Sequence, residues 1–343
     1  MITVVLSALW SASLPAQTIS GLSVTTPVGE GQYASLTGDL IGTPPLTASI
    51  DWGDGSPPEL IAFQLEAAPL AATHLYLDDD PSGTAEDELT IEVSLTDGGG
   101  GEDVARVGVI VLNAAPVLHN LFVTSPVEES GVASLTAAIG DEGVLDSFSI
   151  LVDWGDGSPQ EIYNYPAGAT AILETHSYLD DDPSGTGSDA YEVTVTIEDD
   201  DTGVDTAALP IEVVNVAPTL HFVSITTPVE AGQPAALSGF FSDPGILDTF
   251  TLEVDWGDGS PPEIFPYPAG STSFGANHSY AFGGVRVIEL ALRDDDQGSA
   301  FDVLEVEVPG DPPPAAVPTL GRAAAGVLVA LLLLAAARHR RAA

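Results

Sequence analysis

Hydrophobic and polar residues alternate along several short stretches of this chain. Residues 191–197, 89–95 and 288–292 each carry apolar side chains at every second position, and residues 304–308 repeat the pattern. A period of two is typical of β-strands that bury one face. Turns rich in Gly, Pro and Asp separate these stretches, and no helical period precedes residue 320. The pattern predicts an all-β protein built from antiparallel β-sandwiches.

One heptapeptide, Asp-Trp-Gly-Asp-Gly-Ser-Pro, occurs three times, starting at Asp51, Asp153 and Asp255, with a spacing of 102 residues each time. A constant period of this length predicts tandem copies of one domain. The predicted boundaries are 16–114 for repeat 1, 115–216 for repeat 2 and 217–309 for repeat 3. Repeat 2 has three residues that repeat 1 lacks, which the alignment places at Ala137–Ile139 as a tolerated loop change.

The heptapeptide is interpreted as a core anchor and a turn. Asp-Gly after a strand favours a tight turn, because glycine accepts positive φ and aspartate bonds to the backbone. The tryptophan is the large apolar residue of a small core. The residues expected in these roles are Asp51, Trp52, Asp54, Asp153, Trp154, Asp156, Asp255, Trp256 and Asp258. In every copy a His-x-Tyr follows, with its histidine 22 residues after the tryptophan.

These motifs carry a family resemblance. The Trp-Gly-Asp-Gly-Ser-Pro turn, the His-x-Tyr and the strand that follows resemble the PKD domain, an Ig-like β-sandwich of extracellular proteins. The resemblance covers residues 16–309. The family usually has an aromatic residue or Trp-Asp-Phe before Gly-Asp-Gly, whereas here the tryptophan stands directly before the first glycine. It implies tandem sandwiches and an extracellular setting, and it implies an activity only weakly.

The charge of the chain is strongly negative. There are 51 acidic residues against seven basic ones, all arginine, for a net charge of −44. Such a surface repels nucleic acid and attracts cations, so nucleic acid is excluded as a partner. The chain has no cysteine, which excludes disulfides and thiol chemistry.

The C-terminal residues predict a membrane anchor. Residues 310–317 read as a proline-rich stalk, and Ala323–Ala337 is an apolar run that ends in an arginine cluster. Extending the run back to Val317 gives 21 residues, enough for one transmembrane helix within 318–343. The arginines predict a cytoplasmic C-terminus and an exported repeat array at the cell envelope or surface.

Val317, Pro318, Thr319 and Leu320, followed by an apolar helix and a basic tail, resemble the IPTL-CTERM protein-sorting signal. The resemblance implies export and an exosortase-like processing enzyme as a partner. Valine stands for the usual isoleucine, and the segment after the motif departs from the family pattern. At the other end, residues 1–15 fit either a signal peptide or the last strand of an upstream repeat.

The acids and histidines suggest two kinds of chemistry. Histidine and paired acids in each copy could serve acid–base catalysis, but the turn already requires the aspartates, and the histidine is expected to bond a neighbouring loop. Acidic triplets could bind Ca²⁺, which takes six to eight oxygen ligands. Only repeat 2 holds both triplets, so the candidate ligands are Asp180, Asp181, Asp182, Asp199, Asp200 and Asp201, with solvated loops as the alternative.

The sequence therefore predicts a non-catalytic surface protein of the cell envelope. An acidic rod of sandwiches would act as a spacer or as an adhesion or display module that meets a protein or a glycan. Two alternatives stay open: a calcium-dependent adhesion module, and the C-terminal fragment of a larger secreted enzyme or adhesin. Ca²⁺ is the one possible cofactor.

Overall fold

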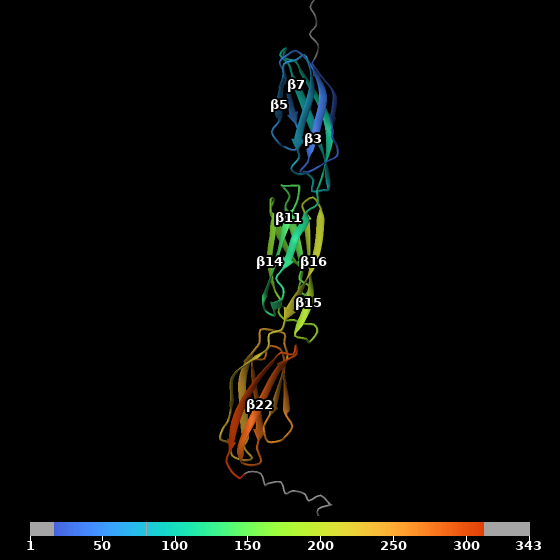
Figure 1. Cartoon of the computed structure of the whole chain (residues 1–343). Coiled ribbons are helices and arrows are strands. Elements are labelled where there is room, and N and C mark those ends of the chain that lie inside the picture. Colours follow the sequence, from blue (N-terminus) through green and yellow to red (C-terminus); the bar gives the residue numbers. More distant parts are fainter. Residues whose placement is uncertain (1–16, 80, 312–343) are drawn as a thin grey trace, which may run out of the picture. The chain divides into compact units, whose positions relative to one another are not determined.

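The computed structural model describes residues 17–79 and 81–311 (Figure 1). The described residues form two compact units. Unit 1 holds repeats 1 and 2 and comprises residues 17–79, 81–216 and 244–246. Unit 2 holds nearly all of repeat 3 and comprises residues 217–243 and 247–311. All of the regular elements in these ranges are β-strands.

Several predicted segments lie outside the described residues. These are residues 1–15, most of the stalk, the sorting motif Val317–Leu320 and the expected transmembrane helix within 318–343. Within 17–79 and 81–311, no helix is long and apolar enough to cross a membrane.

Repeat 1 is a sandwich of a three-stranded and a five-stranded sheet, with orders β1-β3-β6 and β2-β8-β7-β4-β5. The pairs are antiparallel except β2–β8, which is parallel. The strands are β1 (Thr18–Val24), β2 (Val28–Gly29), β3 (Tyr33–Ile41), β4 (Leu46–Asp51), β5 (Glu59–Phe63), β6 (Ala67–Leu75), β7 (Glu86–Thr96) and β8 (Glu102–Leu112).

Repeat 2 has the same arrangement, with sheet orders β9-β11-β14 and β10-β16-β15-β12-β13. Its strands are β9 (Val117–Val123), β10 (Val127–Glu128), β11 (Val132–Gly140), β12 (Phe148–Asp153), β13 (Glu161–Tyr165), β14 (Ala171–Ser177), β15 (Ser188–Asp199) and β16 (Val204–Val214).

Unit 2 pairs a three-stranded sheet, β17-β18-β21, with a four-stranded sheet, β20-β19-β22-β23. Its strands are β17 (Thr219–Ile225), β18 (Pro234–Ser242), β19 (Phe250–Asp255), β20 (Glu263–Tyr267), β21 (Ser273–Ser279), β22 (Gly284–Asp294) and β23 (Ser299–Val308).

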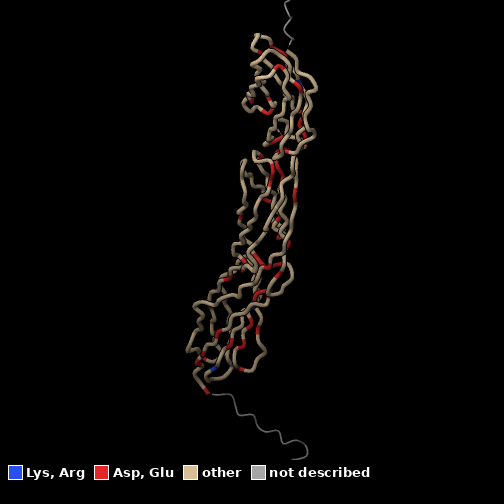
Figure 2. Tube along the Cα trace, turned by 45° about the horizontal axis from the view of Figure 1, so that its top comes forward, with Lys and Arg blue, Asp and Glu red and all other residues tan. Residues whose placement is uncertain are grey.

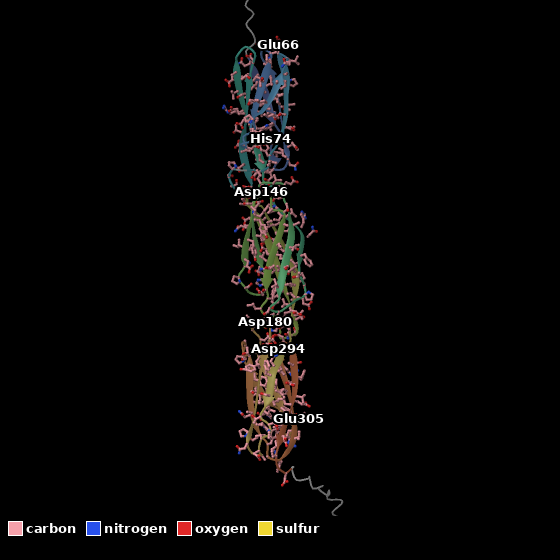
Figure 3. All side chains as sticks on the ribbon, turned by 90° about the vertical axis from the view of Figure 1, so that its left-hand side faces the viewer. Glu66, His74, Asp146, Asp180, Asp294 and Glu305 are labelled. Carbon is pink, nitrogen blue, oxygen red and sulfur yellow. The ribbon has the colours of Figure 1, made fainter. Side chains whose placement is uncertain are left out.

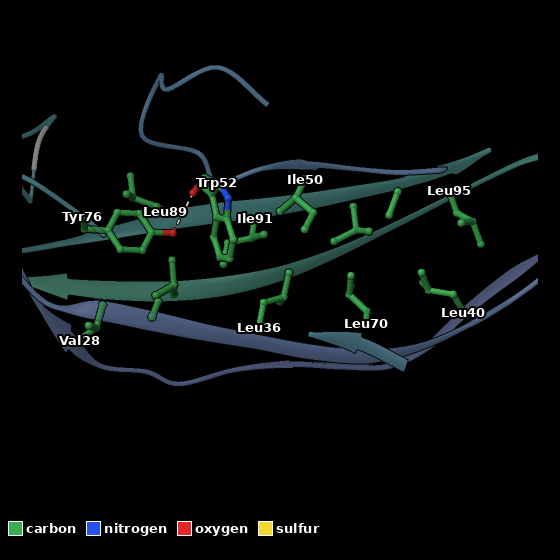
Figure 4. Close-up of a cluster of buried hydrophobic side chains, with 14 of the residues drawn as sticks. Val28, Leu36, Leu40, Ile50, Trp52, Leu70, Tyr76, Leu89, Ile91 and Leu95 are labelled. Atoms are coloured by element: carbon green, nitrogen blue, oxygen red, sulfur yellow. Dashed lines mark hydrogen bonds between the residues drawn. The ribbon is translucent and has the colours of Figure 1, made fainter. Parts of the chain in front are cut away.

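Each sandwich closes around its own core because one face of every long strand is apolar. In β7 the alternating residues Leu89, Ile91, Val93 and Leu95 are all buried, as the period of two predicts. Figure 4 shows Leu89, Ile91 and Leu95 among the core side chains of repeat 1, together with Trp52. Separate cores of the same kind occupy the other two repeats. The all-β sandwich class predicted from the sequence is confirmed for the described residues.

The length difference between repeats 1 and 2 lies in a loop, not at Ala137–Ile139. Strands β3 and β11 both have nine residues, and Ala137–Ile139 belongs to β11. The connection to the next strand is 42–45 in repeat 1 and 141–147 in repeat 2. The three-residue difference was therefore placed wrongly, inside β11 instead of in the loop that follows it. The added residues instead extend a loop that carries two aspartates and a glutamate.

Candidate functional site

The heptapeptide of each repeat forms a turn that its two aspartates stabilise. In repeat 1, Oδ1 of Asp51 accepts the N–H of Gly53 at 3.0 Å, and Oδ1 of Asp54 accepts the N–H of Ser56 at 3.0 Å. Repeats 2 and 3 have the same bonds at 2.9–3.0 Å. Gly53 has a φ of 85°, and a Cβ there would lie 2.7 Å from the carbonyl oxygen of Thr90. The turn therefore requires glycine at this position.

Three aromatic rings pack behind each turn. The His74 ring stacks on Trp52 with centroids 4.8 Å apart, and its Nε2 lies 2.6 Å from Oδ2 of Asp54. The Tyr76 hydroxyl donates to the carbonyl oxygen of Trp52 at 2.9 Å, which is the dashed line in Figure 4. We name these four residues and their equivalents the turn cluster. The equivalents are Trp154, Asp156, His176 and Tyr178 in repeat 2, and Trp256, Asp258, His278 and Tyr280 in repeat 3.

The carboxylate of each turn cluster is well supplied with donors. Partial burial opposes ionisation of Asp156, but hydrogen bonds from Ser158 and His176 outweigh it and hold the pKa of Asp156 below its usual value. The same balance lowers the pKa of Asp54, and it lowers the pKa of Asp258 to about 2. These aspartates are ionised and paired within their own repeat.

The turn cluster resembles a catalytic set only in its residue types. A pocket of about 300 Å³ lies beside Asp54, Ser56 and His74. The backbone N–H of Ser56 and Nε2 of His74, however, both bond the Asp54 carboxylate, and the Ser56 hydroxyl bonds no histidine, so the serine–histidine–aspartate relay that acyl transfer requires is not formed. The histidine is also held against the tryptophan ring. The contacts account for the His-x-Tyr signature through packing and turn stabilisation.

A second group of acids lies where repeat 1 contacts repeat 2 inside unit 1, close to Asp146 in Figure 3. In three overlapping groups, one oxygen from each member lies within 4.8 Å of the others. The groups are Glu30 with Asp78 and Asp79, Glu30 with Asp141 and Asp146, and Asp78 with Asp146 and Asp201. We name these six residues the junction cluster.

Direct hydrogen bonds hold the two repeats together around the junction cluster. Nδ2 of Asn113 in repeat 1 donates to Oδ2 of Asp199 in repeat 2 at 3.0 Å. Nε2 of Gln32 donates to Oε2 of Glu142 at 2.6 Å. The contact is close, since a Cβ on Gly31 would lie 2.8 Å from the Cβ of Glu142. The cluster is therefore enclosed by both repeats.

Three members of the junction cluster, Glu30, Asp79 and Asp146, are buried and leave carboxylate oxygens without donors. Glu30 and Asp79 are 0% exposed and Asp146 is 1% exposed. Both carboxylate oxygens of Asp79 and of Asp146 lack a hydrogen-bond partner, as does Oε2 of Glu30. The arginines of residues 17–79 and 81–311 make their contacts elsewhere: Arg106 with Glu92, Arg286 with backbone carbonyls and Arg293 with Phe301. Burying carboxylates without partners is costly.

Burial and mutual repulsion act together on these acids. Desolvation, then the charge of Glu30 and other carboxylates, raises the pKa of Asp146 to about 9. Desolvation likewise raises the pKa of Glu30 and of Asp79 to about 7, and that of Asp141 to about 6. The cluster resists full ionisation at neutral pH unless a cation is present.

The structure separates the two acidic triplets that the sequence offered as calcium ligands. Asp180–Asp182 and Asp199–Asp201 lie at opposite ends of β15, whose 12 residues span about 36 Å, so no single ion contacts both. Figure 3 shows Asp180 and Asp146 at opposite ends of repeat 2. In the second triplet, only Asp201 belongs to the junction cluster.

Three other members of the triplets, Asp199, Asp200 and Asp180, accept backbone N–H groups. Oδ1 of Asp199 accepts the N–H of Asp201 at 3.0 Å, and Oδ1 of Asp200 accepts that of Ser147 at 2.7 Å. At the far end of β15, Asp180 and Asp181 are buried, and Oδ1 of Asp180 accepts the N–H of Asp182 at 3.3 Å.

Sequence reasoning missed Glu30, Asp141 and Asp146. Glu30 stands alone in a turn after β2, more than 100 residues from its neighbours in repeat 2. The sequence signal that could have indicated them was the longer loop 141–147. This loop supplies Asp141 and Asp146 at the end of repeat 2 where repeat 1 contributes Glu30 and Asp79.

No protein-family model and no curated protein sequence matches the chain. Solved structures do match. A tetra-tandem repeat in the extending region of a large adhesion protein is 16% identical, with 85% of this chain and 74% of that chain covered and a TM-score of 0.43. The Sidekick-1 immunoglobulin domains 1–5 are 13% identical, with 87% and 60% covered and a TM-score of 0.37.

A PKD domain of an M14-like peptidase from a Thermoplasmatales archaeon is 25% identical over 28% of this chain and 99% of that chain, with a TM-score of 0.25. All three TM-scores lie below 0.5, so the sandwich architecture described above rests on the strand pairing of this chain alone.

Proposed function

We propose that this chain is a non-catalytic, exported module of the cell envelope that acts as a spacer or as an adhesion or display element. The observation that carries the proposal is the use of the repeated motif. In each of the three repeats, the same aspartate, histidine, tryptophan and tyrosine stabilise one turn and pack at one core. A motif with this use serves the folding of each copy, and tandem copies of a self-contained sandwich add length.

The surface supports an extracellular role. Figure 2 shows acidic residues throughout both units and very few basic ones. A strong net negative charge keeps the repeats soluble and disfavours contact with anionic lipid and nucleic acid. The surface contact of the module would be a protein or a glycan. Residues 318–343 would anchor it in the membrane, with an exosortase-like enzyme as its processing partner.

The test uses cells that produce the full chain. An antibody against repeat 1 is expected to bind intact cells, and deletion of residues 115–216 is expected to preserve this binding while reducing adhesion to immobilised proteins or glycans. Repeats found only inside the cell would contradict the proposal. The proposal would also be contradicted if the purified chain turned over a substrate and the His176→Ala variant lost this activity.

The junction cluster favours a second candidate, a calcium-dependent form of the same module. Carboxylates that are buried together without donors are expected where a cation binds.

A further inference from the structure

The geometry points to a Ca²⁺ site between repeats 1 and 2 in which Glu30, Asp79, Asp141 and Asp146 are ligands and Asp78 and Asp201 complete the shell. The site joins two repeats, whereas the sequence suggested loops within repeat 2 alone. This inference deepens the calcium-dependent candidate and rests on it. It does not depend on whether the chain is displayed at the cell surface.

The first argument is the state of the ligand atoms. Asp79 and Asp146 are at most 1% exposed, and none of their four carboxylate oxygens has a hydrogen-bond partner. They converge with Glu30 and Asp141, which keep Oε2 and Oδ2 free after Oε1 of Glu30 accepts the Ala114 N–H and Oδ1 of Asp141 accepts the Gly143 N–H. Oxygens left free in this way are available to a metal ion.

The second argument is the space around these oxygens. A Cβ on Gly143 would lie 2.5 Å from Oε2 of Glu30 and 2.6 Å from both carboxylate oxygens of Asp146. Any side chain at this position would therefore occupy the point where carboxylates of the two repeats meet. The glycine leaves that point open.

The third argument comes from the ends of the repeats. At the end of repeat 2 that contacts repeat 1, the 141–147 loop and the turn after β15 supply Asp141, Asp146 and Asp201. At the corresponding end of repeat 1, the loop is Gly42-Thr-Pro-Pro45 and the turn is Asp97-Gly-Gly-Gly-Gly101. Within the described residues of unit 1, that end contacts no other repeat, and there Asp97 accepts the N–H groups of Gly99, Gly101 and Thr43.

The ligand type selects the ion. All six residues of the cluster offer carboxylate oxygens, and the chain has no cysteine to favour zinc. Ca²⁺ accepts an irregular set of six to eight oxygens, whereas Mg²⁺ requires near-ideal octahedral geometry and retains its waters. Extracellular calcium modules bind with dissociation constants of about 10⁻⁴–10⁻³ M. A bound ion would connect four segments of chain from two repeats and so stiffen unit 1.

The test is calorimetric titration of the purified, chelator-treated full chain with Ca²⁺. Asp146→Asn and Asp79→Asn, one from each repeat, are the test variants. Glu198→Gln is the matched control, because it removes one exposed carboxylate at the end of β15 next to the junction. Each test variant is expected to lose one bound ion or to weaken its binding at least about tenfold, and the control is expected to stay within about twofold. The readout is the difference between variants, since other acidic loops can take up cations weakly.

A second measurement covers the case of a poorly folded variant. Ca²⁺ at 100 times its dissociation constant should raise the melting temperature of the wild-type chain by about 5–10 °C, while NaCl of equal ionic strength should not. Equal heats for the wild type and both test variants would overturn the site, as would an equal shift with NaCl. Mg²⁺ binding as tight as that of Ca²⁺ would overturn the choice of ion. If titration with Ca²⁺ gives no heat of binding while the repeats are still exposed on the cell surface, the calcium site is contradicted and the spacer function is not.

Discussion

Asp156 and Asp146 lie ten residues apart in repeat 2, yet their surroundings differ in every respect. Asp156 has a side chain that is 16% exposed and bonds His176 and Ser158, and its pKa is lowered. Asp146 is 1% exposed, has no donor for either oxygen, and faces other carboxylates that help to raise its pKa. The turn cluster is complete within one repeat. The junction cluster is assembled only where a second repeat is present, and we propose that a cation completes it.

The largest expected effect comes from removing the buried tryptophan of a turn cluster. Trp154→Ala should lower the free energy of unfolding by about 3–5 kcal/mol, because it empties the centre of the repeat 2 core. The loss should be the same with Ca²⁺ or with chelator. Urea denaturation of the full chain measures it, with Leu173→Ala, at a position 67% exposed, as the control expected within about 0.5 kcal/mol. A loss seen only in chelator would contradict the division between the clusters.

Acidity should act on the two clusters in opposite senses. For the junction cluster the folded pKa values are raised, to about 7 for Glu30 and Asp79 and about 9 for Asp146. The folded state then binds more protons than the unfolded state above about pH 4, so stability in chelator falls as the pH rises toward 9. A folded pKa that lies one pH unit above the unfolded pKa changes stability by about 1.4 kcal/mol, or about 2–4 °C in melting temperature.

For the turn cluster the folded pKa is lowered, to about 2 for Asp258. Its contribution is present above the unfolded pKa of about 4 and is lost as the pH falls toward 2. Melting curves from pH 2 to 9, with and without Ca²⁺, check both senses. Stability in chelator that rises steadily from pH 5 to 9 would contradict the assignment of the junction cluster.

A smaller effect is expected from one carboxylate of the turn cluster. Asp156→Asn keeps the size of the side chain but removes the charge that bonds His176 at 2.8 Å, and should cost about 1–2 kcal/mol. The cost should not depend on calcium. Chemical denaturation at pH 7 measures it against Glu305→Gln, an exposed position, and no loss would indicate that the His–Asp pair is not formed.

The smallest effect is expected at the surface. Arg106 and Glu92 form an ion pair with side chains 63% and 38% exposed, so Arg106→Ala should change stability by at most about 1 kcal/mol. The same denaturation series measures it. A cost near that of Trp154→Ala would show that surface pairing carries stability in this acidic chain.

The sandwich and the turn cluster were accessible from sequence because both are local and repeated. A period of two marks β7, and the heptapeptide with His-x-Tyr recurs at a constant spacing. The junction cluster was not accessible in the same way. Glu30 and Asp146 are 116 residues apart, and their approach depends on how two sandwiches meet. The acidic triplets indicated the correct type of residue, but the two triplets lie at opposite ends of β15 and cannot bind the same ion.

The most direct test is the melting temperature of Asp146→Asn beside that of Asp156→Asn, each measured in chelator and in millimolar Ca²⁺. The account predicts that in chelator Asp146→Asn raises the melting temperature, because it removes a buried carboxyl group that must take up a proton, or stay charged without a partner, when the chain folds. Asp156→Asn is predicted to lower it. In Ca²⁺, Asp146→Asn should lose most of the increase of the wild type, and Asp156→Asn should keep it. Equal decreases for both variants in chelator, with equal gains from Ca²⁺, would contradict the account.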